Sequence, residues 1–463
     1  MDDKIFKLFI AALKNRAAVY EFTGNYKACV ADIRTGITAL ERRKRLDPDA
    51  VMGLKTDLAD MALHMEGNVK KAASILNEAE KTVPGISGEA AAYKDNILGI
   101  IRWQEGRFDE ALACLGRTLS FYKRRGEKSG ISNTLNNMAM VSENKGDIKM
   151  AVKYLRAALD IQKKVKNKRG ICVMSVNLGN NLVSLNRYEE AEAYFNEVIR
   201  ISGRIGFKRA EGLASNALGG MYSNKGDLKR ALFYYEKSLK VAEETGSAQR
   251  TGIAYNNIAI VHTQTGRYEK ALEYYKKNLE ISEKLESDNM RSYSYINLAS
   301  ACLDMNMTKE GAFYLGKAAG IVNASGNKAQ LVDVHTTYSD LHIRRREFGK
   351  ALKRAVMALE LTNEIGLEER RPFVLRNLGL CQLRFDRMKA EECFIRSLNV
   401  ALKAGMLLDS AYAGYELGKM YSLDKRKKRQ AAKYLQDAQS IFEKNGIKIH
   451  SKEIKGILKK LKR

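Results

Sequence analysis

The chain has 463 residues, and its 80 Lys and Arg against 54 Asp and Glu give it a formal charge of +26 at pH 7. Apolar residues make up 45% of the sequence, so the chain is able to bury a sizeable core and is not disordered by composition. Only three residues are proline, which excludes a collagen-like chain, a proline-rich linker and a turn-dense β-sandwich, and favours a chain that is helical almost throughout.

The N-terminal segment predicts a protein of the cytosol. It starts acidic and carries Lys14 and Arg16 within its apolar stretch, so it lacks the features of a secretory signal. No stretch approaches the ~18 uncharged apolar residues of a membrane span. The cysteines are scattered without a C-x-x-C pair, which favours reduced, mostly buried side chains: Cys29, Cys114, Cys172, Cys302, Cys381 and Cys393.

A short turn signal, Gly or Asn followed two positions later by an aromatic or aliphatic residue, recurs along the chain. It begins at Gly24 and Gly67, returns at a constant spacing from Gly106 to Gly266, and shifts by one position near Phe385. A small residue stands five positions after most of these turns, and another stands seven positions before them. Gly or Asn at the turn ends one helix, and the small residues allow two antiparallel helices to approach closely. The pattern predicts about eleven copies of one helix pair, which must stack to bury a continuous core.

The units differ along the chain. Residues 1–85 are expected to hold degenerate units, because acidic Asp60 occupies a small-residue position, with the repeats starting by Phe6. Residues 86–325 form the regular 40-residue array, and residues 326–445 form the C-terminal units. All three prolines fall between units, where helices start or end: Pro48, Pro84 and Pro372.

Residues 446–463 are expected to form a basic amphipathic helix after the last unit. Ser451 is suited to the N-cap, and one face carries apolar residues: Ile454, Ile457, Leu458 and Leu461. We expect this helix to cap the open end of the array. Binding to an anionic membrane or to a partner is the alternative.

One unit carries the order Leu218-Gly219, Tyr222, Gly226, Ala231 and Tyr235. This order resembles the tetratricopeptide repeat family. The 40-residue period and the Asn-Asn-x-Ala helix starts at 136–139 and 256–259 are similar to the long-helix repeats of kinesin light chains. The resemblance covers nearly the whole chain and implies an all-α, right-handed α-solenoid of antiparallel helix pairs.

No pattern in the sequence predicts an enzyme. The chain has no phosphate-binding loop, kinase signature or H-E-x-x-H motif, so neither a cofactor nor a metal is expected. His262 and His342 occupy the repeat position that holds Tyr222 in another unit, which predicts that both replace a packing aromatic residue.

Amide side chains recur on the first helix of each pair. One column is formed by Asn137, Asn177, Asn257, Asn297 and Asn377, and a second, seven residues later, includes Gln104, Asn144, Asn224 and Gln264. Amides are able to hold an extended peptide backbone without reading its sequence. The resemblance implies that the first column holds a bound peptide in the concave groove. The alternative is that these side chains bond one another and stabilise neighbouring helices.

Basic residues concentrate toward the C-terminus. Arg344, Arg376 and Arg384 enter the predicted groove positions, which favours an acidic ligand at that end. Residues 421–463 carry fourteen Lys and Arg against four Asp and Glu, or +10 of the total +26. The basic run 425–429 is interpreted as a solvated loop, with phosphates or an acidic partner as the alternative.

These patterns favour a non-enzymatic scaffold that binds a peptide or a helical segment of a protein, and the ends of such an array also offer surfaces for self-association. A regulatory or sensor module of a signalling system is an alternative function. The bacterial peptide-receptor phosphatase regulators have similar repeats after a separate three-helix module, which an array starting by Phe6 would lack. Nucleic-acid binding by a basic solenoid is a further alternative, but RNA-reading pentatricopeptide arrays have a shorter period than this chain.

Overall fold

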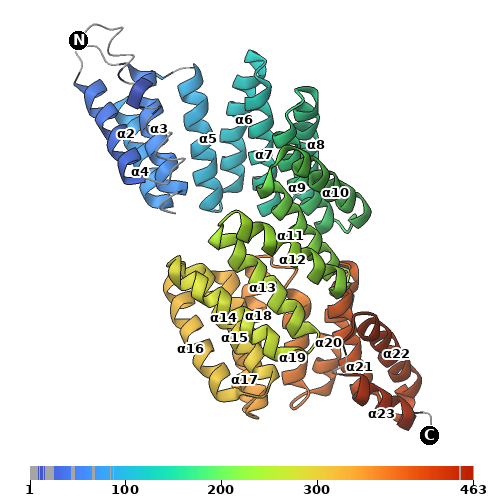
Figure 1. Cartoon of the computed structure of the whole chain (residues 1–463). Helices are drawn as coiled ribbons and strands as arrows, with labels where there is room; N and C mark the ends of the chain where they lie inside the picture. Colours follow the sequence, from blue (N-terminus) through green and yellow to red (C-terminus); the bar gives the residue numbers. More distant parts are fainter. Residues whose placement is uncertain are drawn as a thin grey trace. The chain divides into compact units, whose positions relative to one another are not determined.

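The computed structural model describes residues 9, 11–13, 15, 26–42, 47–64, 68–83, 85–86, 88–447 and 450–461, and the regular structure in these ranges is helical (Figure 1). The chain divides into two compact units, Met1–Asn181 and Leu182–Arg463, and the boundary lies near the end of one helix, α9. The regularity of the repeat divides the sequence differently, into 1–85, 86–325, 326–445 and 446–463. The two compact units are instead defined by contacts between residues.

In the first unit, consecutive helices pack as pairs α3/α4, α5/α6 and α7/α8, and α2 packs on α3. The bounds are α2 Tyr26–Glu41, α3 Pro48–His64, α4 Val69–Thr82, α5 Gly88–Gln104, α6 Phe108–Arg125, α7 Lys128–Asn144, α8 Ile148–Lys164 and α9 Lys168–Ser184.

In the second unit the same arrangement runs from α11/α12 to α21/α22, with α10 packed on α11 and α23 on α22. The bounds are α10 Tyr188–Ile205, α11 Lys208–Asn224, α12 Leu228–Glu244, α13 Ala248–Gln264, α14 Tyr268–Lys284, α15 Asp288–Asp304, α16 Thr308–Ser325, α17 Lys328–Arg344, α18 Phe348–Glu364, α19 Arg371–Gln382, α20 Arg387–Lys403, α21 Leu407–Tyr421, the short 3₁₀ helix η1 Lys425–Lys427, α22 Lys428–Lys444 and α23 Ser451–Leu461.

The predicted period is confirmed by the helix starts and by the turns. From α7 to α17 the first helices begin at a constant spacing, at Lys128, Lys168, Lys208, Ala248, Asp288 and Lys328. The turn positions inside the pairs have left-handed backbone, with φ between 59° and 88°, at Gly106, Gly146, Asn186, Gly226, Gly266, Asn306 and Arg346. Glycine and asparagine tolerate this conformation best, which explains why the sequence signal recurs there.

The period breaks where Pro372 lies near the start of α19, which begins at Arg371 and is only 12 residues long. Pro48 is the first residue of α3, so both prolines occupy first-turn positions, where a missing backbone N–H costs little. Pro84 and Phe6 lie outside the described residues.

Close approach of the two helices depends on the small residue of the first helix. A Cβ atom on Gly219 would lie 2.5 Å from the Tyr235 ring, and one on Gly379 would lie 2.5 Å from the Phe394 ring. The ring therefore occupies the space that a side chain would need. The small residues of the second helices, such as Ala231 and Ala390, are fully buried.

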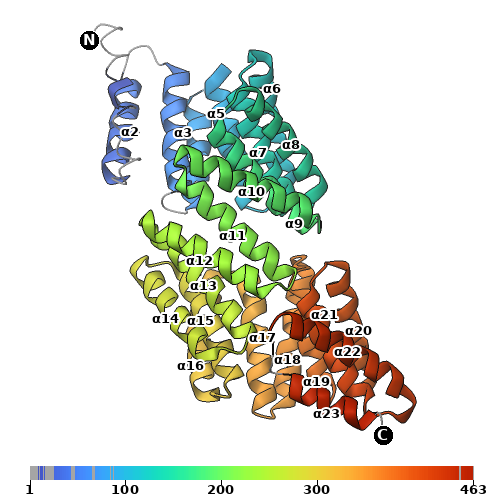
Figure 2. The ribbon, with the colours of Figure 1, turned by 45° about the vertical axis from the view of Figure 1, so that its right-hand side comes forward.

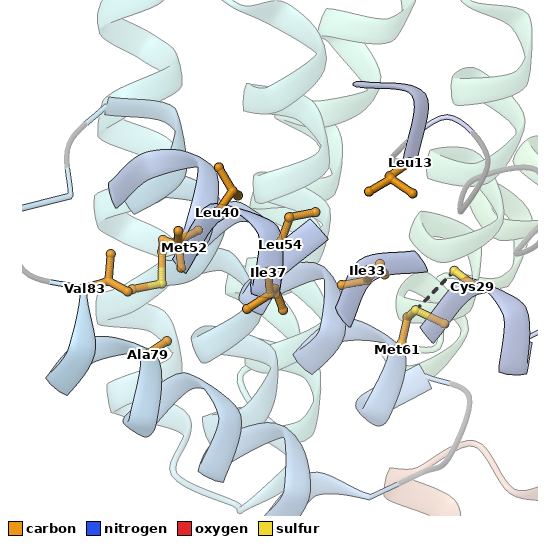
Figure 3. Packing of buried hydrophobic residues seen from close by; sticks show 11 residues of the cluster. Leu13, Cys29, Ile33, Ile37, Leu40, Met52, Leu54, Met61, Ala79 and Val83 are labelled. Carbon is orange, nitrogen blue, oxygen red and sulfur yellow. Dashed lines mark hydrogen bonds between the residues drawn. The ribbon is translucent and has the colours of Figure 1, made fainter. Parts of the chain in front are cut away.

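The first unit has a continuous apolar core in the region that the sequence presents as degenerate. Figure 3 shows this cluster, in which Ile33, Ile37 and Leu40 of α2 pack near Met52 and Leu54 of α3. Cys29 lies in the same cluster, with its sulfur 3.4 Å from the sulfur of Met61. All six cysteines are buried, as the sequence predicts.

The C-terminal helix α23 lies beside α22 (Figure 2). Its apolar face is turned inward: Ile454 is fully buried, and Leu461 packs at the edge of a buried cluster that includes Phe394 and Leu417. Glu453 accepts a hydrogen bond from the Tyr415 hydroxyl. It also lies 3.1 Å from the Lys419 ammonium. These contacts support our interpretation of the helix as a cap.

Replacement of Gly219 by Ala should lower the free energy of unfolding by about 1–3 kcal/mol, because the new methyl group overlaps the Tyr235 ring. Gly316→Ala is the matched control in the same unit: nothing lies within 4 Å of its added Cβ, so it should raise stability by about 0.5–1 kcal/mol. Urea unfolding followed by circular dichroism measures both changes. Equal effects in the two variants would contradict the close-approach explanation.

Candidate functional site

The predicted asparagine column forms hydrogen-bonded pairs between neighbouring repeats. In the first unit, Asn137 Nδ2 donates to Asn96 Oδ1 at 3.1 Å, and Asn177 Nδ2 donates to Asn136 Oδ1 at 2.8 Å. All four side chains are half-buried. This geometry is the mutual bonding that the sequence leaves as the alternative to peptide binding.

The second unit repeats the arrangement. Asn257 Nδ2 donates to Asn216 Oδ1 at 2.8 Å, and Asn297 Nδ2 donates to Asn256 Oδ1 at 2.7 Å. Each donating amide has a second N–H and an oxygen that these bonds do not use. A role in holding a peptide backbone therefore stays a prediction. Asn377 differs, since it is buried and its Oδ1 has no hydrogen-bond partner among the described residues.

The second amide column lies at the ends of the first helices. Gln104 and Asn144 are exposed in the first unit, and Asn144 bonds back to the Met140 carbonyl at 2.9 Å. In the second unit, Asn224 is exposed and Gln264 is half-buried. Both columns are thus divided between the two units.

The three predicted arginines have different environments. Arg344 lies between two carboxylates: its Nη2 is 3.0 Å from Asp304 and its Nε is 2.9 Å from Asp340. Arg384 stacks over the Phe348 ring at 5.0 Å. Since Arg344 is already paired, its charge is not available to an acidic ligand.

Arg376, like Arg384, is stacked on aromatic rings. Its guanidinium stacks over the rings of Phe373, at 5.3 Å, and Tyr412, at 4.7 Å. No carboxylate of the described residues lies within ion-pair distance of it. The two rings orient this cation, and it is close enough to lower the pKa values of Asp304, Asp409 and Glu416.

Several acidic residues of the first helices were not selected from the sequence. Burial raises the pKa of Asp304 to about 6, although Arg344 opposes this shift. Burial also raises the pKa of Asp333, Asp409 and Glu416, each against the effect of nearby cations. A third of the Asp304 side chain is solvent-accessible, so surrounding walls rather than full enclosure dehydrate it. We call Asp304, Asp333, Arg376, Asp409, Tyr412 and Glu416 the inner strip.

Two turns far apart in the sequence meet in the second unit. Asn186 Nδ2 lies 3.5 Å from the Lys403 carbonyl oxygen, and a Cβ on Gly405 would lie 3.2 Å from the Tyr188 hydroxyl. The next repeat makes a similar contact, since a Cβ on Gly226 would lie 3.1 Å from Asn445 Nδ2. The stack of pairs in this unit therefore curves until its first and last repeats touch.

Tyrosines from opposite parts of this curved stack share one environment. Burial raises the pKa of Tyr268, on α14, to about 12, and the charges of Asp304 and of Tyr412, on α21, contribute to the shift. The pKa of Tyr412 is raised by burial, with Asp304 again contributing. A stack whose ends touch encloses one face. Because Asp304 and Tyr412 both lie close enough to Tyr268 to shift its pKa, we infer that the inner strip lies on this enclosed face.

The histidines pack as predicted. His262 is buried and stacked on Tyr274 with ring centroids 5.6 Å apart, and burial lowers its pKa to about 4. His342 is half-buried beside Tyr338, and its Nδ1 lies 2.6 Å from Glu347. In the described ranges, no group of three or more His, Cys, Asp or Glu side chains is arranged to hold a metal ion. A search of the described helices found none with the length and apolar character needed to cross a bilayer.

Residues 89–164, 170–244 and 250–324 match the family model of the tetratricopeptide repeat. No curated protein matched the sequence. Solved structures match in fold at low identity. A Rap protein complexed with competence and sporulation factor is 16% identical with a TM-score of 0.55, covering 77% of this chain and 98% of that one.

The apo quorum sensor NprR from B. thuringiensis is also 16% identical, with a TM-score of 0.56, covering 78% of this chain and 99% of that one. A STAND signal-transduction ATPase with a tetratricopeptide repeat sensor, from Pyrococcus horikoshii, is 14% identical with a TM-score of 0.50, covering 87% of this chain and 63% of that one.

Replacement of Asn137 by Ala should lower the free energy of unfolding relative to Asn133→Ala by about 1 kcal/mol. Both residues lie on α7, and both changes gain helix propensity, but only Asn137 bonds Asn96 in the preceding repeat. Thermal unfolding of the two variants gives the comparison. Identical melting temperatures would show that the asparagine pairs do not stabilise the stack.

The raised pKa of Asp304 makes stability depend on pH. The folded chain holds this proton more tightly than the unfolded chain does, so the contribution is fully present below about pH 4 and is lost as the pH rises through about 6. Asp304→Asn removes this titration. The melting temperature of the variant relative to the native chain should therefore increase from pH 4.5 to pH 8, and a constant difference would contradict the assignment.

Proposed function

Because this chain is a tetratricopeptide repeat protein, we propose that it is a non-catalytic scaffold of the cytosol that binds a peptide or a helical segment of another protein. The inner strip of the second unit is the proposed binding surface. The observation that carries the proposal is the stacked and unpaired Arg376 beside dehydrated carboxyl groups on the enclosed face.

The charges of the inner strip favour a ligand with groups of both signs. Arg376 offers a fixed cation to a carboxylate, such as an acidic side chain or a peptide C-terminus. Asp409 and Glu416 have raised pKa values because of burial, so a cationic group of the ligand would stabilise their ionised forms. The purely acidic ligand expected from the arginines alone is less favoured, since Arg344 is paired with Asp304 and Asp340.

The asparagine pairs fit a role beside this strip. Asn257 and Asn297 are held in one orientation by their bonds to the preceding repeat, and each keeps an N–H and an oxygen for a peptide group. Fixed amides lose little side-chain entropy when a ligand binds.

A regulatory or sensor role is the second candidate. One structure of similar fold is a Rap protein complexed with competence and sporulation factor, and another is a quorum sensor. At this identity the similarity supports the proposal only as analogy of fold. The hydrogen bond from Asn186 to the Lys403 carbonyl joins distant repeats of the second unit. A ligand on the enclosed face would have to fit within that closed stack.

Selection from a displayed library of random dodecapeptides tests the binding surface directly. Selected peptides should bind the native chain and lose at least tenfold in affinity with Arg376→Gln or Asp409→Asn, measured by calorimetry. Arg204→Ala, an exposed cation on α10 in the same unit, is the control and should bind unchanged. Equal affinity in all variants, or a library that yields no binder, would contradict the proposal.

A further inference from the structure

A second surface of the second unit has a different character. The turns that join first and second helices line one edge, and near the C-terminus these turns contact one another. Arg345 donates to the Thr308 carbonyl at 3.3 Å, Arg384 stacks over Phe348 at 5.0 Å, and Arg387 donates to the Met420 carbonyl at 2.6 Å. We call residues 345–346, 383–389 and 423–429 the basic edge.

Four cations of the basic edge are free to bind a ligand, whereas Lys389 has Asp386 at 3.7 Å. Arg346, Lys425, Lys428 and Arg429 are exposed, and no carboxylate of the described residues lies within ion-pair distance of them. The Arg426 side chain is 92% exposed, with Asp424 at 3.7 Å. Lys427 differs, because it pairs with Glu391 at 2.6 Å and holds its turn against α20. The edge therefore presents several unneutralised charges on an ordered backbone.

Apolar side chains protrude between these cations. Met388 is 82% exposed and Leu423 is 78% exposed, the two highest values for large apolar side chains in the described part of the chain. Phe385 is 57% exposed, and Leu383 lies beside it in the same turn. Single exposed apolar residues are ordinary in folded proteins. Four of them on two contacting turns instead indicate a surface that binds another molecule.

We propose that the basic edge docks the protein onto an anionic lipid bilayer. Lys and Arg near a membrane surface are attracted to acidic headgroups, and apolar side chains beside them enter the boundary between headgroups and acyl chains. A nucleic acid would engage the cations but leave Met388 and Leu423 in water. A protein partner would need a hole for each protruding side chain, whereas a bilayer is soft and needs none.

The edge is separate from the inner strip. It consists of turns and the starts of the helices that follow them, whereas the inner strip consists of residues on the first helices, and the two share no residue. Membrane docking therefore does not depend on the proposed peptide binding. The helix α23, which the sequence offers as a membrane-binding element, has its apolar Ile454 fully buried and is not needed for it.

Sedimentation of the full chain with two kinds of vesicle tests the proposal: pure phosphatidylcholine, and phosphatidylcholine in which about one third of the lipid is phosphatidylglycerol. The native chain should bind only the anionic vesicles. The triple variant Lys425→Ala, Lys428→Ala and Arg429→Ala should lose about a hundredfold in partition coefficient, at about fivefold for each cation. The double variant Met388→Ser and Leu423→Ser should lose at least tenfold.

Two controls match these variants in charge and in apolar exposure. Lys123→Ala, Arg124→Ala and Lys128→Ala remove the same charge from exposed sites of the first unit. Phe313→Ser and Leu402→Ser remove side chains that are 58% and 56% exposed elsewhere on the second unit. Both controls should bind as the native chain does. Equal loss in a control and in its matched variant would overturn the proposal, because binding would then follow total charge or total apolar surface.

Insertion is measured separately with a tryptophan probe. Met388→Trp, in a Trp103→Phe background, should shift its emission to shorter wavelength with anionic vesicles. Sedimentation without this shift would mean that only the cations act, and would overturn docking by insertion. Tighter binding to a DNA duplex than to anionic vesicles, with the same loss in the triple variant, would assign the edge to nucleic acid instead.

Discussion

The close approach of two helices within each pair is the constraint on which the rest of this structure depends. At Gly219 and Gly379 the neighbouring aromatic ring fills the space of the missing side chain. A larger residue at either site would overlap the ring unless the ring or the partner helix moved away, and the second helix would then cover the apolar face of the first less closely. Because each pair is completed by the next one, a change in this distance would also alter the stacking of its neighbours.

The same constraint explains why side chains of one chemical type line up in columns along the stack. With helix starts at a constant spacing, side chains one repeat apart lie next to one another, as Asp304 and Arg344 do. In the amide pairs the donor is one position further along its helix than the acceptor, so these pairs are separated by one repeat plus one position. Side chains at fixed positions thus form pairs between neighbouring repeats.

The sequence is sufficient for local features and insufficient for long-range ones. The left-handed turns at Gly226 and Asn186 were predictable, because backbone conformation there restricts residue type directly. The Asp304–Arg344 pair was also accessible, since opposite charges stand in one column of the repeat. The contact of Asn186 with Lys403 was not, because it depends on small rotations that accumulate over all the intervening helix pairs, and no single residue encodes them.

The curvature of the second unit gives its charged side chains two different environments. Asp304 and Asp409 belong to the inner strip, on the face that the curved stack encloses. Burial raises the pKa of both groups, although the charge of Arg376 opposes each shift. The turns of the basic edge remain outside this enclosure, so their cations stay hydrated and accessible. One curved stack therefore separates a partly dehydrated interior, suited to selective binding of a small segment, from an exposed edge suited to a charged surface.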